Sequence, residues 1–141
     1  MKEILRDAFN EVMDVTDSMS ISFQCDRQED HFIIYANEVT LNNHDDDIRI
    51  EIAVNDGGGA TFYAVFDKLD ETPTTLRLLN EFNEDTLFFS AYIGSKGYLT
   101  LRHFTIWNDP KELKAFANEA LSRLGGMADN EILQRITKYT S

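Results

Sequence analysis

The chain has 141 residues, of which 43% are hydrophobic and 27% charged; it is long enough to bury a core and too apolar for wholesale disorder. Its net charge of −12 disfavours binding to nucleic-acid phosphates and to anionic lipid, because like charges repel. Basic or amphipathic protein segments are the expected partners, unless the charge serves solubility alone.

The first half of the chain predicts a helix followed by antiparallel strands. Apolar residues at helical spacing predict an amphipathic helix over 3–16. A short strand is expected at 18–25, and strands rich in β-branched and aromatic residues at 31–41, 48–55 and 61–66. A glycine-rich turn separates the last two, so the three longer strands predict a meander.

The second half begins with a helix over 72–85, for which Thr72 is a cap and Pro73 suits the first turn. A hairpin of strands at 87–93 and 98–107 follows.

Asp109-Pro110 then predicts the start of a helix over 109–124, which Gly125-Gly126 should end, and Asp129 can cap a last short helix. Tight turns between consecutive strands require antiparallel pairing. The order α-β-β-β-α-β-β-α plus a short C-terminal helix therefore predicts the α+β class, in one domain over 1–141.

The last strand changes the parity of its apolar residues. Leu99 and Leu101 share one face, whereas Phe104 and Ile106 lie on the other. A bulge near Arg102-His103 would return all four to one face; otherwise both faces of the sheet are partly apolar.

Further apolar residues fall on the parity opposite to the stronger core positions: Tyr63, Val65, Phe88 and Tyr92. Such surplus apolar surface indicates a covering helix or a partner subunit, and we expect a homodimer. Asn80 and Asn83 share one face of the second helix, where their amides either bond the neighbouring backbone or form a polar recognition spot. These six residues make up the candidate interaction surface.

No catalytic, cofactor or metal site is predicted. The acidic turn 44–47 offers at most a weak site for a divalent cation, and such a turn between strands is usually only solvated. The triple glycine 57–59 leads into a strand and lacks the Gly-Lys-Ser/Thr of a phosphate-binding loop. The single cysteine excludes an intramolecular disulfide. Because neither a signal peptide nor an apolar run of membrane-spanning length is recognisable, we expect a cytoplasmic protein without membrane contact.

Residues 75–83, 88–93 and 98–101 together resemble the YbjN family, bacterial proteins described as sensory transduction regulators. They read Thr-Leu-Arg-Leu-Leu-Asn-Glu-Phe-Asn, Phe-Phe-Ser-Ala-Tyr-Ile and Tyr-Leu-Thr-Leu, and residues 109–124 fit the family's closing helix. The resemblance implies a fold similar to the class I type III secretion chaperones, which are small, acidic homodimers that wrap extended effector segments.

The leading hypothesis is a cytoplasmic, non-enzymatic, homodimeric protein, regulatory or chaperone-like, that binds another polypeptide. The alternatives are a small-molecule-binding or enzymatic domain with an aromatic cleft, and a structural subunit of a larger complex. Any recognition surface is expected on the sheet or on its flanking helices.

Overall fold

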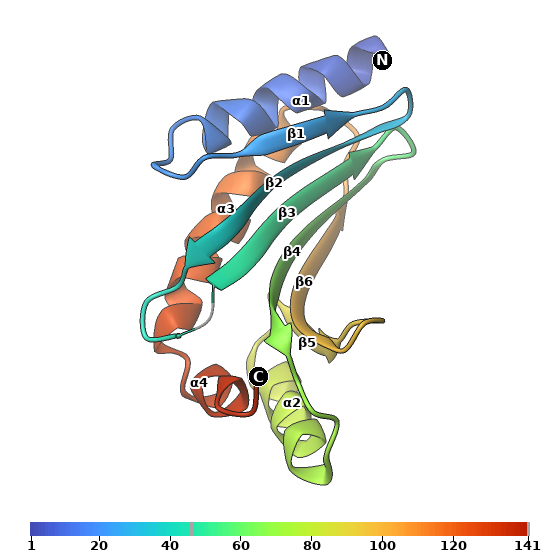
Figure 1. Cartoon of the computed structure of the whole chain (residues 1–141). Coiled ribbons are helices and arrows are strands. Elements are labelled where there is room, and N and C mark those ends of the chain that lie inside the picture. Colours follow the sequence, from blue (N-terminus) through green and yellow to red (C-terminus); the bar gives the residue numbers. More distant parts are fainter. Residues whose placement is uncertain (46, 141) are drawn as a thin grey trace.

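The computed structural model describes residues 1–45 and 47–140 and has the predicted α+β fold (Figure 1). The elements of the described residues are α1 (Glu3–Thr16), β1 (Gln24–Arg27), β2 (His31–Thr40), β3 (Asp47–Asn55), β4 (Gly59–Lys68), α2 (Pro73–Asp85), β5 (Ser90–Ile93), β6 (Tyr98–Ile106), α3 (Glu112–Gly126) and α4 (Glu131–Thr137). A 3-10 turn at Met127–Asp129 connects the last two helices. No helix in the described part is long and apolar enough to span a membrane.

The strands form one antiparallel sheet in the order β1-β2-β3-β4-β6-β5. The predicted meander is β2-β3-β4; β1 pairs with its outer side, and the β5–β6 hairpin joins through β6. Gly58 in the β3–β4 turn has φ +94°, and a Cβ there would lie 3.1 Å from the Trp107 carbonyl oxygen, so this position requires glycine. Register shifts between Ala36 and Val39 and between Val65 and Lys68 mark irregularities in β2 and β4.

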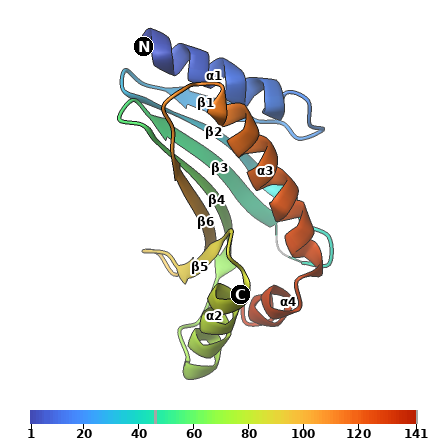
Figure 2. The same ribbon diagram turned by 180° about the vertical axis from the view of Figure 1, so that it is seen from behind.

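One face of the sheet packs against α1 and α3, as the view from behind shows (Figure 2). Along β2, β3 and β4 the side chains alternate between buried and half-buried, which is the period of a strand with one covered face. The largest fully buried side chains come from the sheet and from both helices, and they include Leu5, Phe32, Ile34, Ile50, Ile52, Phe62, Leu101 and Leu113.

A second packing region lies at one end of the sheet, where α2 and α4 lie side by side (Figures 1 and 2). Thr72 caps α2 as predicted: its hydroxyl oxygen accepts from the Thr75 amide at 3.2 Å, and its own amide donates to the Thr75 hydroxyl at 2.9 Å. Phe82 of α2 and Leu133 and Ile136 of α4 are fully buried.

The first and fifth strands begin later than predicted. The structure places β1 at Gln24–Arg27 rather than at 18–25, because pairing with Phe32–Tyr35 of β2 decides its position and local alternation does not. The β5 strand begins at Ser90 rather than at residue 87, and Leu87 is 95% exposed.

The predicted helix boundaries near the C-terminus also need correction. The helix α3 ends at Gly126, within the predicted Gly125-Gly126 stop and two residues after the expected last residue 124, and a 3-10 turn follows it directly. The cap of α4 is Asn130, whose side-chain oxygen accepts from the Leu133 amide at 2.8 Å, rather than Asp129.

Candidate recognition surface

The side of the sheet opposite α1 and α3 is not covered by any helix of the described chain, and we call it the open face (Figure 1). The side chains that the strand register and the alternation of burial place on it include Gln24, Asp26, His31, Ile33, Tyr35, Asp47, Arg49, Glu51, Ala53, Thr61, Tyr63, Val65, Asp67, Lys68, Ser90, Tyr92, Tyr98, Thr100, Arg102, Phe104 and Ile106. The acidic ones are Asp26, Asp47, Glu51 and Asp67, and the basic ones are Arg49, Lys68 and Arg102. The opposite charges on the open face therefore nearly balance, although the chain carries −12.

Both arginines of the open face lie over tyrosine rings. The guanidinium carbon of Arg49 is 4.3 Å from the ring centre of Tyr35, and that of Arg102 is 4.9 Å from the ring centre of Tyr92. Burial raises the pKa of the Tyr92 phenol above its ordinary value, and the nearby Arg102 cation partly opposes this shift. The result is a surface rich in tyrosine and arginine, the residue types enriched at protein interfaces.

Two large apolar side chains project from the end of β6 on this face. Phe104 is 55% exposed and Ile106 is 69% exposed. Their position settles the parity question of the sequence: the register between β4 and β6 runs without interruption from Thr100 to Ile106, so no bulge lies at Arg102-His103 and both sheet faces are partly apolar.

A hollow of about 540 Å³ lies on the same sheet between β2 and β4, away from these projecting side chains. Phe104 stands opposite Thr61, and Thr61 stands opposite Ala53, so one row across the sheet runs from a large side chain to two small ones. Ile33 and Tyr63 also line the hollow. The open face thus carries a projection and a depression two strands apart.

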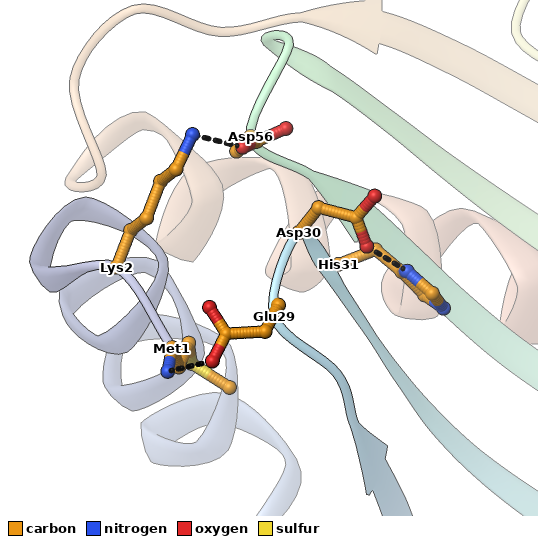
Figure 3. A network of polar contacts seen from close by, with 6 residues as sticks. All are labelled: Met1, Lys2, Glu29, Asp30, His31 and Asp56. Carbon is orange, nitrogen blue, oxygen red and sulfur yellow. Dashed lines mark hydrogen bonds and ion pairs between the residues drawn. The ribbon is translucent and has the colours of Figure 1, made fainter.

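Polar contacts join one rim of this hollow, formed by Asp30 and Asp56, to the residues at the start of α1 and to His31 (Figure 3). The Lys2 ammonium lies 2.6 Å from the Asp56 carboxylate, and this hydrogen bond raises the pKa of Lys2. Asp30 lies 2.7 Å from the His31 ring nitrogen, and that hydrogen bond lowers the pKa of Asp30. The two carboxylates at the rim, Asp30 and Asp56, are therefore both partnered.

The outer edge of β6 is only partly paired. β5 covers it from Leu99 to Arg102, and beyond Arg102 no described strand pairs with it. The Trp107 amide donates to the Gly58 carbonyl on the β4 side, so by alternation the backbone groups of Phe104 and Ile106 point away from the sheet. The Thr105 hydroxyl contacts the Ile106 carbonyl only at 3.5 Å.

A groove of about 340 Å³ runs between this edge and α3 on the covered side of the sheet. On α3 its lining is apolar at Phe116 and Ala115, and its two carboxylates have partners: Glu112 accepts from the Asp109 amide at 2.9 Å, and Glu119 accepts from the Arg123 guanidinium at 3.0 Å. The unpaired edge and the groove lie side by side, so a strand added to the edge would direct alternate side chains into the groove.

Comparison with known proteins identifies no relative of this chain. No protein-family model, curated protein or solved structure matches the chain. The interpretation of the open face and of the β6 edge therefore rests on their own geometry and chemistry.

The structure brings together three of the six residues predicted for the interaction surface. Tyr63, Val65 and Tyr92 are half-buried on the open face, and Tyr63 and Tyr92 flank Arg102. Asn80 and Asn83 lie on α2 instead, beside the sheet end.

Asn83 has the structural role. Its side-chain nitrogen donates to the Ala91 carbonyl at 3.0 Å and its side-chain oxygen accepts from the Ala91 amide at 2.7 Å, so it fastens α2 to β5. Asn80 is exposed, and no hydrogen bond joins its side chain to the described residues.

Phe88 lies on the covered side rather than on the open face. Its ring stacks on His103 at 3.7 Å between ring centres, and the His103 Nδ1 is 2.8 Å from the Phe88 carbonyl oxygen. The Arg123 guanidinium lies 4.8 Å above the Phe88 ring. Parity fails for Phe88 because it precedes the first residue of β5, where strand alternation does not yet apply.

The acidic turn 44–47 includes Asp46, which lies outside the described residues. His44 is buried, with its Nδ1 3.2 Å from the Thr137 hydroxyl, and it lines a cleft of about 700 Å³ together with polar residues of α4. Among the described residues, no three His, Cys, Asp or Glu side chains gather closely enough to hold a metal ion. The small-molecule or enzymatic alternative stays a prediction.

Phe104, Ile106 and Arg102 of the open face are not among the six residues predicted for the interaction surface. For Phe104 and Ile106 the sequence contains a signal, the parity change of the last strand, but that change allows two arrangements. For Arg102 the sequence contains no such signal, because its stacking on Tyr92 depends on the pairing of β5 with β6.

Proposed function

We propose that the protein is a non-enzymatic polypeptide-binding module, regulatory or chaperone-like, that accepts an extended segment along the outer edge of β6. The observation that carries the proposal is the unpaired stretch after Arg102, where the backbone groups of Phe104 and Ile106 point outward. A segment added there would bond with both residues as a further strand. Proteins usually protect such edges with charge or proline, and the stretch His103–Ile106 contains neither lysine nor proline.

The groove beside the edge defines the chemistry of the segment. Alternate side chains of an added strand would face α3, where Phe116 and Ala115 favour an apolar residue. Glu112 and Glu119 already have partners within the chain, so a preference for lysine or arginine comes from the net charge of −12 and not from these two carboxylates. The expected ligand is thus an extended, apolar and basic segment. The resemblance to the YbjN family and to secretion chaperones supports the same class of partner.

The test uses a displayed library of random peptides selected on the immobilised protein, followed by fluorescence anisotropy of the selected peptides. Ile106→Pro removes the outward amide and blocks strand addition, whereas Ile106→Ala removes the side chain and keeps the amide. Losing one backbone hydrogen bond and gaining a steric clash should weaken binding about tenfold or more in Ile106→Pro relative to Ile106→Ala.

Amide hydrogen exchange supplies a second measurement. The amides of Phe104 and Ile106 should exchange more slowly when a selected peptide is bound, because both become donors to it. Selected peptides that bind the two Ile106 variants equally and leave these amides unprotected would refute the β6 edge as the binding site.

A further inference from the structure

The open face is a second interaction surface, and we propose that it is covered by a second copy of this chain, packed open face against open face about a two-fold axis that runs along β4. This inference does not rest on the proposed binding of a segment at the β6 edge. It rests on the charge of the open face, on its shape and on the positions that one axis brings together.

Charge separates a second copy from other partners. A chain with a net charge of −12 repels its own copies over most of its surface, and a basic partner would be attracted there. The open face is the exception, because its acidic residues Asp26, Asp47, Glu51 and Asp67 are nearly balanced by Arg49, Lys68 and Arg102. Two such faces repel each other little, and their tyrosines are of a residue type enriched at protein interfaces.

Shape adds a self-complementary feature. Phe104 projects from β6, and the hollow over Ala53 lies on β3, with β4 between them. Strands are spaced about 4.8 Å apart, so projection and hollow are about 10 Å apart in one row. A two-fold axis over Thr61 places Phe104 of each copy over Ala53 of the other.

The same two-fold axis also brings two opposite charges together, although only the positions of Phe104 and Ala53 define the axis. In the neighbouring row Arg102 of β6, Tyr63 of β4 and Glu51 of β3 stand opposite one another. Rotation about β4 therefore brings Arg102 of one copy to Glu51 of the other, twice in the dimer. Tyr63 and Val65 meet their own counterparts near the axis.

The test measures the dimer dissociation constant by analytical ultracentrifugation over a concentration series. The wild-type chain should be a dimer. Arg102→Glu and Glu51→Arg should each weaken it about a hundredfold, because each places like charges together twice. The double variant Arg102→Glu/Glu51→Arg should recover most of the affinity, since it recreates both opposite-charge contacts. Glu84→Arg, on exposed α2 surface, is the matched control and should change nothing.

The projection is tested separately. Phe104→Ala should weaken the dimer about tenfold or more, whereas Ile4→Ala, at a 42% exposed position on α1, should not. A circular dichroism melt of each variant establishes that it is folded. A wild-type monomer at the highest concentration, or single variants that leave the dimer intact, would overturn the proposal. Failure of the double variant to recover a dimer that both single variants weaken would overturn the axis.

Discussion

Asn83→Ala should weaken the attachment of α2 to β5. The substitution removes both hydrogen bonds to Ala91, at 3.0 and 2.7 Å, and Ala91 itself is only 3% exposed. Each such bond contributes about 0.5–1.5 kcal/mol net, and an unpaired buried backbone group costs a similar amount. Because the Asn83 side chain stands at the surface, water can replace part of the loss. We expect the free energy of unfolding to fall by about 1–2 kcal/mol.

Urea unfolding followed by circular dichroism measures this difference. With a slope of about 2 kcal/mol per molar urea, the midpoint should fall by about 0.5–1 M. Asn80→Ala is the matched control, since it makes the same change of residue type on the same helix and carries the same gain in helix propensity. The difference between the two variants isolates the contacts with Ala91. Equal midpoints for Asn83→Ala and Asn80→Ala would refute the fastening role.

Two further predictions concern the α2 cap and Tyr92. Thr72→Ala should lower the free energy of unfolding by about 1 kcal/mol, because the Thr75 amide loses its acceptor. The control Thr74→Ala, at an exposed position in the first turn of α2, should change this free energy little. Urea unfolding compares the two variants, and equal midpoints would contradict the capping role of Thr72. The Tyr92 phenol should ionise above its ordinary pH range, as the difference in absorbance titration between wild type and Tyr92→Phe would show. Because the fold raises the pKa of Tyr92, the fold is favoured by the neutral phenol; this contribution is present below the ordinary pKa of 10.0 and is lost as the pH rises above it. Ionisation of Tyr92 at or below the ordinary pKa would count against the burial of its side chain.

The elements predicted correctly are those whose signal is local. The helix at Glu3–Thr16 is predicted by its apolar stripe. The helix at Pro73–Asp85 is predicted by the Thr-Pro pair at its start, and in the structure Thr72 makes the capping hydrogen bonds. The meander follows from alternation and from a glycine-rich turn. In each case one segment of chain contains both the element and the chemistry that stabilises it.

The elements that were misplaced depend on contacts between distant segments. The position of β1 is decided by the residues of β2 that it pairs with, and most of the strand predicted at 18–25 precedes it. Phe88 was assigned by counting from a strand that begins only at Ser90. Counting parity is valid inside a strand, and its ends are set by the partner strand rather than by the sequence.

The parity change in the last strand shows where sequence reasoning has to stop. A bulge or a two-sided apolar strand would explain Leu99, Leu101, Phe104 and Ile106 equally well. Only the register of β6 on β4 distinguishes them, because it runs through Arg102 and His103 without an extra residue. The composition of the strand was sufficient to predict surplus apolar surface, but its location required the long-range pairing.

The distribution of charge changes the inference about partners. A net charge of −12 suggests basic partners for the whole molecule, yet the opposite charges on the open face nearly balance, while the groove beside β6 lies outside that balanced face and offers the apolar side chains of Phe116 and Ala115. The two surfaces therefore favour different partners: the groove an apolar and basic segment, the open face a second copy. They are also on opposite sides of the sheet, so a dimer through the open face would leave the groove free. It follows that Glu51→Arg should separate the copies without abolishing peptide binding. Ile106→Pro should weaken peptide binding about tenfold or more relative to Ile106→Ala. It should weaken the dimer no more than Ile106→Ala does, because the backbone amide that it removes points outward from the β6 edge and not across the open face.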